Sequence, residues 1–150
     1  MINKDIIRLA SNTSNAGLKN KYSHKISLKN TTCGDKITLE LIVDEKKISS
    51  MKYETVSCVY CEASASLLAR KIKNIKLKDI KNDFTILKNV STKKNVKIPK
   101  RLSDFRKLLN SDNFNRFKCI FLPIDAVLKA LKLWKKYSLF YLCSVFFQKL

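Results

Sequence analysis

The stretch Ser57-Cys58-Val59-Tyr60-Cys61-Glu62-Ala63-Ser64-Ala65-Ser66-Leu67-Leu68-Ala69-Arg70 predicts a strand followed directly by a helix, with a thiol at the junction. Its small residues at 63–66 allow the helix to approach a neighbouring surface closely. We expect Ser57 to be the N-cap, with Glu62 in the first turn, where its negative charge favours the helix dipole. An apolar face follows at helical spacing: Ala65, Leu68, Ile72 and Ile75.

Cys58 stands where a helix N-terminus stabilises the thiolate form, which makes a thiol a ligand or a nucleophile. Considered alone, Cys58 is equally well interpreted as a small core residue. The chain before it predicts a hairpin, with strands at 36–43 and 48–56 around the turn 44–47. The apolar positions of the second strand are Ile48, Met51, Tyr53 and Val56.

The turn Cys33-Gly34-Asp35 leads into the first strand of this hairpin, and Cys58 follows the second strand. In an antiparallel hairpin the first strand begins at the same end of the sheet at which the second strand finishes. Cys33, Asp35 and Cys58 are therefore expected close together. Gly34 frees the backbone so that Cys33 and Asp35 can point the same way. The hairpin therefore predicts a site at one end of the sheet.

The rest of the chain predicts one domain without repeats, since 150 residues suffice for a single core. We expect a helix at 4–10, a strand at 22–29, a second helix at 76–90 and a short helix at 102–110. A final helix is expected within 114–133, beginning at Pro123. His24 is the single histidine and is interpreted as a surface residue rather than a metal ligand.

The formal net charge is +19, from 31 basic and 12 acidic residues. A nucleic-acid or acidic-protein surface is one interpretation of this excess. The lysines are spread along the whole chain, however, and arginine is rare. We therefore favour a compositional origin, expect no nucleic-acid partner, and leave an acidic protein partner open.

The N-terminus lacks the apolar core of a signal peptide, which predicts a cytoplasmic, reducing location. In that setting five cysteines indicate metal or sulfur chemistry rather than disulfides. The apolar run at 139–147 is far shorter than the ~20 residues that span a bilayer. We expect 135–150 to be an extension that packs on the body, with Cys143 structural; a membrane-surface or partner-binding tail is the alternative.

Cys33, Asp35, Cys58 and Cys119 supply three thiols and one carboxylate, each beside a turn or helix start. This donor set matches tetrahedral zinc, and three thiolates also suit an iron–sulfur cluster. The spacing differs from the paired Cys-x-x-Cys knuckles of zinc fingers.

Three motifs resemble the iron–sulfur cluster scaffold family that includes IscU, the N-terminal part of NifU, and SufU. They are 32–37 (Thr-Cys-Gly-Asp-Lys-Ile), 58–66 with its Ala-Ser-Ala-Ser, and 116–119 followed by Leu122-Pro123. The resemblance extends from residue 4 to about 133, which places the domain at 1–134.

The resemblance implies an α+β fold of the SufE/IscU-like type, a three-stranded antiparallel sheet covered on one side by helices. It implies that Cys33, Cys58 and Cys119 hold a transient [2Fe–2S] cluster or Zn²⁺. Asp35 is then the fourth ligand or the group that keeps the cargo labile. The implied role is a scaffold rather than an enzyme, with a cysteine desulfurase (SufS/IscS-like) and acceptor proteins as partners.

Two departures from the IscU type resemble SufU instead. Lys118 stands where IscU-type proteins carry a histidine, and the segment between Cys58 and Cys119 is longer. SufU-type proteins bind zinc and accept persulfide sulfur, which makes zinc-dependent sulfur transfer the alternative function. Candidate persulfide acceptors are Cys33, Cys58, Cys119 and Cys61.

Cys61 is a third departure, because it creates a Cys-x-x-Cys motif at a helix start. A thioredoxin-like redox role is an alternative, although that fold places its motif in a βαβ unit rather than after a hairpin. We expect Cys61 to be a supporting thiol, an alternative ligand or a sulfur acceptor. Arg116 and Lys118 either stabilise thiolate or persulfide charge or are ordinary surface cations.

Overall fold

The structure is a computed structural model that describes residues 2–93 and 95–133. The predicted extension 135–150 and Cys143 lie outside the described residues. The elements in chain order are α1 (Lys4–Ala10), β1 (His24–Lys29), β2 (Lys36–Asp44), β3 (Lys47–Val56), α2 (Val59–Lys71), α3 (Leu77–Asn89), the 3₁₀ helices η1 (Lys100–Lys107) and η2 (Ser111–Arg116), and α4 (Phe117–Ala130).

The strands of the described chain form an antiparallel sheet in the order β1-β2-β3. Glu45 and Lys46 make the tight turn between β2 and β3, with φ of +46° and +61°, the left-handed values of a two-residue hairpin turn. Ser49 is an extra residue in the register, because Ile42 faces Ser50 whereas Val43 faces Ile48. This bulge lets both Ile48 and Met51 face the core despite their odd spacing.

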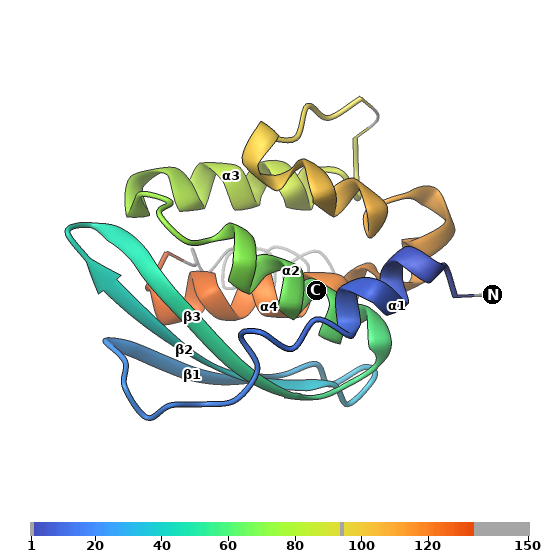
Figure 1. The fold of residues 1–150 in the computed structure, drawn as a ribbon. Coiled ribbons are helices and arrows are strands. Elements are labelled where there is room, and N and C mark those ends of the chain that lie inside the picture. Colours follow the sequence, from blue (N-terminus) through green and yellow to red (C-terminus); the bar gives the residue numbers. More distant parts are fainter. Residues whose placement is uncertain (1, 94, 134–150) are drawn as a thin grey trace, which may run out of the picture.

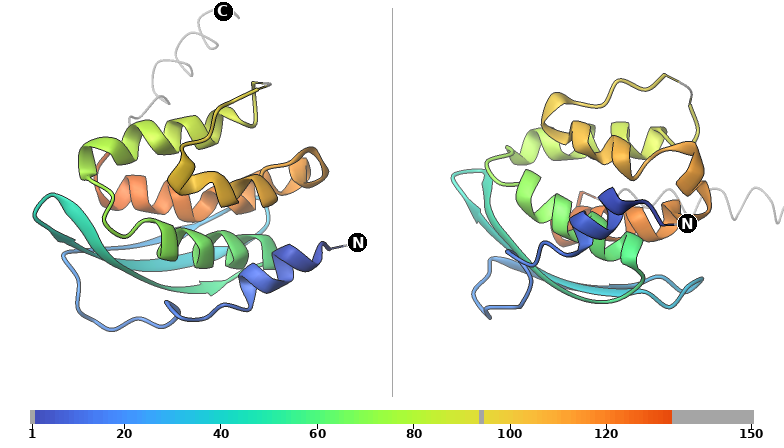
Figure 2. Two further views of the ribbon diagram at one scale, coloured as in Figure 1. Left: turned by 45° about the horizontal axis from the view of Figure 1, so that its top comes forward. Right: turned by 45° about the vertical axis from the view of Figure 1, so that its right-hand side comes forward.

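Helices cover one face of the sheet in two layers (Figure 1). α2 and α4 lie directly on the strands, and α3 and η1 lie above them, as the rotated views also show (Figure 2). α2 is thus packed between other elements, with Ala63, Ala65, Leu67 and Leu68 each 1% exposed or less. The predicted α+β fold with a three-stranded antiparallel sheet is confirmed.

The beginning of α2 corrects one expectation. The N-cap is Cys58, not Ser57, because Cys58 has extended backbone angles and its carbonyl accepts the first helical hydrogen bond from Glu62 N–H at 3.1 Å. α2 ends at Lys71, so Ile72 and Ile75 are buried beyond the helix rather than on its face. Glu62 lies in the first turn as expected.

Two apolar positions were also wrongly predicted. Val56 is 78% exposed. Side chains alternate between the two faces of a strand, and Tyr53 and Thr55 point to the core face, so Val56 points to the opposite face. No second bulge in β3 reverses this order. Pro123 lies inside α4 rather than at its start. A proline there cannot donate to the carbonyl of Cys119, and one turn away the Ser64 hydroxyl donates to the Ile120 carbonyl at 2.6 Å.

Two further elements differ in kind or length from the prediction. The short helix expected at 102–110 is the 3₁₀ helix η1, which buries Leu102 and Phe105. The strand expected at 22–29 begins at His24. The helix expected at 76–90 is present as α3.

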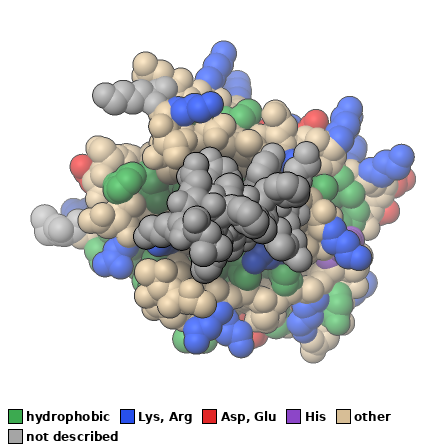
Figure 3. All heavy atoms as spheres, turned by 180° about the vertical axis from the view of Figure 1, so that it is seen from behind, with side chains coloured by type: hydrophobic (Ala, Val, Ile, Leu, Met, Phe, Trp, Pro, Cys, Tyr) green, Lys and Arg blue, Asp and Glu red, His purple; other side chains and the backbone are tan. Residues whose placement is uncertain are grey.

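Lysine and arginine side chains are scattered around the described part of the face in Figure 3. They alternate there with polar and apolar side chains and do not form one continuous stripe. Among the described residues, no helix has the length and apolar character needed to cross a membrane.

Candidate metal and sulfur centre

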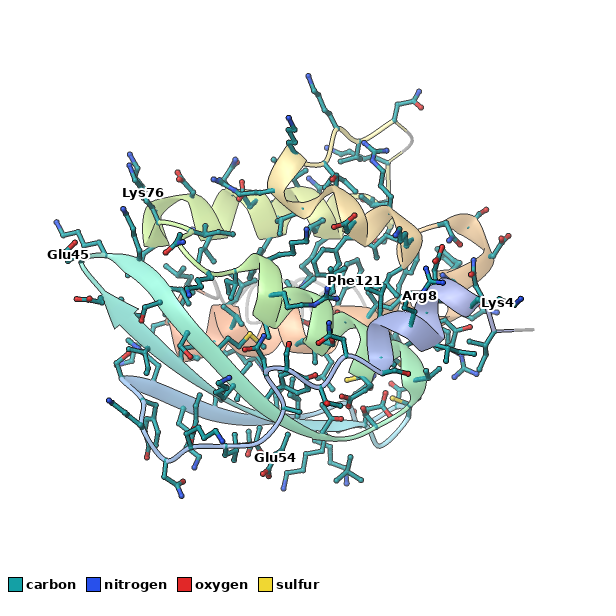
Figure 4. All side chains as sticks on the ribbon, viewed as in Figure 1. Lys4, Arg8, Glu45, Glu54, Lys76 and Phe121 are labelled. Carbon is teal, nitrogen blue, oxygen red and sulfur yellow. The ribbon has the colours of Figure 1, made fainter. Side chains whose placement is uncertain are left out.

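Four chain segments meet at one end of the sheet: the β1–β2 turn, the end of β3, and the N-termini of α2 and α4 (Figure 1). The opposite end of the β2–β3 hairpin carries Glu45, beside Lys76 at the start of α3 (Figure 4). Lys36 pairs with Val56, so the residues just before β2 and just after β3 lie side by side, as the hairpin predicted.

Backbone hydrogen bonds from Asn30 shape the turn that carries Cys33 and Asp35. Asn30 N–H donates to the Asp35 carbonyl at 2.7 Å, and its own carbonyl accepts from Gly34 N–H at 2.8 Å. Gly34 has φ +79°, a left-handed conformation that glycine adopts without strain. Asn30 was not predicted from the sequence. Its signal is an Asn two residues before Thr32, because the Asn30 side chain accepts a hydrogen bond from Thr32 N–H at 2.9 Å.

Asp35 is the residue that joins the turn to α2. Its carboxylate accepts Cys58 N–H at 2.9 Å and the Cys58 thiol at 3.2 Å, and the side chain lies at the helix N-terminus. Burial raises the pKa of Asp35, but hydrogen bonds from Cys58, Cys119 and Cys33 outweigh burial and bring the pKa below its ordinary value. The carboxylate is therefore charged at neutral pH, although Asp35 is only 5% exposed.

Cys119 lies in the first turn of α4 and faces Cys33, with 3.6 Å between their sulfur atoms. Burial raises the pKa of the Cys119 thiol, and the neighbouring Cys33 and Asp35 raise it further. Binding a cation between these groups would release the proton, because thiolate rather than thiol is the metal ligand.

Donor atoms of Cys33, Asp35 and Cys119 all lie within 4.8 Å of one another. Cys58 adjoins this trio through its hydrogen bond to Asp35, but its sulfur lies outside the mutual distance of the three. Two thiols, a carboxylate and an adjacent third thiol fit zinc or an iron–sulfur cargo. Full coordination by all four residues requires the Cys58 side chain to move toward the trio.

Cys61 is fully buried beside this group rather than part of it. Burial raises the pKa of its thiol to about 12, and the nearby charges of Asp35 and Cys58 add to the effect. Its burial closes it to an external sulfur donor. His24 lies at the other end of β1, opposite Leu41, and its ring contacts the Ser23 hydroxyl at 2.9 Å.

The two cations beside Cys119 differ in surroundings. The Arg116 guanidinium lies over the Tyr60 ring, 5.5 Å from its centroid, and so joins the starts of α4 and α2. Lys118 is exposed. Large apolar side chains are also exposed on the segments that lead into the site, Val56 at 78% at the end of β3 and Phe114 at 62% in η2.

A family model, the NifU-like N-terminal domain, matches residues 1–137. The chain belongs to the NifU-like N-terminal domain family. This is the iron–sulfur cluster assembly scaffold family that the cysteine motifs indicated, and the prediction is confirmed. A 52-residue segment, 35% of this chain, is 40% identical to the iron–sulfur cluster assembly scaffold protein IscU of Thermotoga maritima. That match spans 37% of the relative's length.

Solved structures show the same fold. The N-terminal part of a nitrogen-fixing NifU-like protein from Brucella abortus superposes with a TM-score of 0.76 at 20% identity, over 87% of this chain and 91% of that one. A protein from Fervidobacterium islandicum, described as a scaffold for the SUF system, gives 0.72 at 21% identity, over 87% and 96%. At such identities the similarity concerns the fold alone.

Proposed function

We propose that this member of the family receives sulfur from a cysteine desulfurase, assembles a transient [2Fe–2S] cluster and transfers it to acceptor proteins. The observation that carries the proposal is the meeting of Cys33, Asp35 and Cys119 within 4.8 Å, with Cys58 bonded to Asp35. The protein contributes positioning and charge, while carbon–sulfur bond cleavage belongs to the desulfurase. It acts as a carrier rather than as an enzyme.

Asp35 is the residue of the site that favours release of the bound metal or cluster. A carboxylate oxygen holds iron or zinc less persistently than thiolate, so a site with one oxygen donor suits cargo that must leave. Cytoplasmic location follows from this role.

The alternative is a SufU-type protein that holds zinc and accepts persulfide sulfur without building a cluster. Lys118 favours it, because an ammonium group, unlike a histidine, adds no ligand beside Cys119. In this version Cys33, Asp35, Cys58 and Cys119 hold Zn²⁺, and one of the three thiols is released to accept sulfur.

The deciding measurement is the content of iron, zinc and acid-labile sulfide in protein purified without air. Iron with matching sulfide supports the scaffold, and stoichiometric zinc without sulfide supports the SufU-type alternative. Neither metal after reconstitution would contradict both.

Single Ala variants of Cys33, Cys58 and Cys119 are expected to lose metal, whereas the matched variant Cys143→Ala, from the predicted extension, should retain it. Unchanged metal in all three site variants would exclude this ligand set. Asp35→Cys is expected to slow transfer to an apo-ferredoxin, because a thiolate in place of the carboxylate holds the cargo more persistently.

A further inference from the structure

Cys58 and Cys61 occupy two defined positions at the start of α2, the N-cap and the third helical residue. Residues three apart at a helix start lie on the same side of the first turn, about 5–6 Å apart between their Cβ atoms. The Cys58 thiol itself makes no capping hydrogen bond and is directed to Asp35 at 3.2 Å. The turn is formed here, since Glu62 N–H donates to the Cys58 carbonyl at 3.1 Å. The two thiols are therefore neighbours on an already folded backbone.

Their surroundings are unequal. Cys58 is partly exposed and adjoins Asp35, whereas Cys61 is 0% exposed. The Ser57 side chain is a hydrogen-bond partner of Cys61, and Asp35 and Cys58 lie near enough to raise the pKa of its thiol. Cys61 thus cannot meet an external sulfur donor, but it lies one turn from Cys58, whose thiol can reach it by rotating away from Asp35. Burial keeps Cys61 protonated and away from external reagents, so its reaction requires a disulfide-like sulfur held beside it within the chain.

We propose that Cys61 is a resolving thiol that releases sulfide from a persulfide held on Cys58. This inference rests on the sulfur acceptance in the proposed function. It adds an activity that the scaffold role alone lacks, because the chain itself then supplies the electrons that reduce the sulfur.

The step balances without an external reductant. The Cys61 sulfur attacks the Cys58 Sγ, a Cys58–Cys61 bond forms, and the bond between Cys58 Sγ and the terminal sulfur breaks. The terminal sulfur leaves as hydrogen sulfide with the proton of Cys61 and the electron pair of the broken bond. The two cysteines are oxidised to a disulfide while the sulfane sulfur is reduced to sulfide. An external dithiol then returns the pair to thiols.

The positions of the donor atoms agree with separate roles for the metal ligands and for the thiol that accepts sulfur. Cys33, Asp35 and Cys119 form the close trio, and Cys58 lies just outside it. Iron held by the trio would therefore lie beside the thiol from which sulfide is released. Cluster assembly requires sulfide rather than sulfane sulfur, so release at this point supplies sulfur in the oxidation state that iron takes up.

The test uses the full metal-free chain under anaerobic conditions, loaded with inorganic polysulfide and then desalted. Sulfide release is measured without added reductant, and peptide mass spectrometry locates persulfide and disulfide. Wild-type protein and the matched control Cys143→Ser are expected to release close to one equivalent of sulfide and to form the Cys58–Cys61 disulfide. Cys61→Ser should keep the persulfide on Cys58 and release at least ~10-fold less sulfide.

Cys61→Ala repeats the measurement with no polar group in the core, so that one variant stays folded if the other does not. Equal sulfide release by wild type and both variants would overturn the inference. A persulfide on Cys61 in wild-type protein would also overturn it, as would the absence of a persulfide on Cys58 in Cys61→Ser. Reconstitution of the same proteins with iron and sulfide salts separates the two claims. Uptake that does not depend on Cys61 keeps the scaffold, whereas no uptake even by wild type contradicts the proposed function.

Discussion

Gly34 is the single residue on which the shape of the Cys33–Asp35 turn depends most directly. Its φ of +79° costs roughly 1–2 kcal/mol for a residue with a Cβ. Gly34→Ala is therefore expected to lower the free energy of unfolding by about this amount and to weaken zinc affinity by moving Cys33. Urea unfolding and a competitive zinc titration measure the two effects.

Gly34→Asn is the matched control, because asparagine tolerates left-handed backbone angles better than alanine. It should recover part of the lost stability. If Asn were as harmful as Ala, backbone strain would not be the cause.

At the site, the sequence predicted which residues meet but not how they meet. Cys33, Asp35 and Cys58 followed from hairpin geometry, whereas Cys119 required the family resemblance, because 60 residues of helix and loop separate it from Cys58. The role of Asp35 at the start of α2 could not be predicted. A capping carboxylate supplied by a distant turn leaves no local spacing in the sequence.

At the scale of elements, the buried contact between α2 and α4 depends on Ser64. Its hydroxyl donates to the Ile120 carbonyl at 2.6 Å in a fully buried position, one turn before Pro123 and its missing donor. Ser64→Ala is expected to lower the free energy of unfolding by about 1–3 kcal/mol, because a buried acceptor loses its partner. Thermal or urea unfolding followed by circular dichroism measures this.

The control for Ser64 is Thr85→Ala, which removes an exposed hydroxyl bonded to the Lys81 carbonyl of its own helix. Its effect should be within ~0.5 kcal/mol of zero. Comparable losses in both variants would show that the contact between α2 and α4 is not what Ser64 stabilises.

Glu40 connects the sheet to the loop before β1. Its carboxylate accepts Lys19 N–H at 2.9 Å and Asn20 N–H at 3.1 Å, and it pairs with Lys25 at 3.2 Å. Burial raises the pKa of Glu40, but these backbone and lysine contacts outweigh burial and lower the pKa from 4.5. A lowered pKa gives stability that is present above about pH 4.5 and is lost as pH falls through the folded-state value.

Glu40→Gln is therefore expected to melt at lower temperature than wild type at neutral pH, with the difference shrinking in acid. Melting curves between neutral pH and pH ~3 measure this. Glu54→Gln is the control, since Glu54 is exposed and accepts only a long contact from Leu18 N–H at 3.4 Å among its described hydrogen bonds. A difference for Glu40→Gln that does not change with pH would exclude the charge as the cause.

The elements themselves were predicted where the pattern was local. α1, the hairpin and α3 follow from periodicity and turn residues, and their bounds agree within a residue or two. The errors at Val56 and Pro123 have tertiary causes. The exposure of Val56 depends on the pairing of β3 with β2, a pairing that has a bulge at Ser49 and none after it. The place of Pro123 inside α4 depends on how α4 packs against α2. Neither contact can be recognised in a local sequence pattern.

For the whole molecule, the excess of positive charge predicts how stability responds to salt. With 31 basic and only 12 acidic residues, most cations lack an acidic partner, and the net charge of +19 opposes the compact state. Paired groups such as Lys71 and Asp104, 2.7 Å apart, lose attraction in salt, but repulsion among the excess cations is screened as well. Repulsion involves more pairs and should dominate.

The melting temperature is therefore expected to rise when sodium chloride increases from about 20 to about 200 mM, since the Debye length then falls from roughly 20 to below 10 Å. The rise should be smaller for a variant in which three exposed lysines are replaced, Lys78→Glu, Lys81→Glu and Lys97→Glu, because its net charge is lower. A fall in melting temperature with salt would mean that the ion pairs outweigh the repulsion. The scattered lysines would then be arranged for mutual attraction with the acidic groups rather than reflecting composition alone.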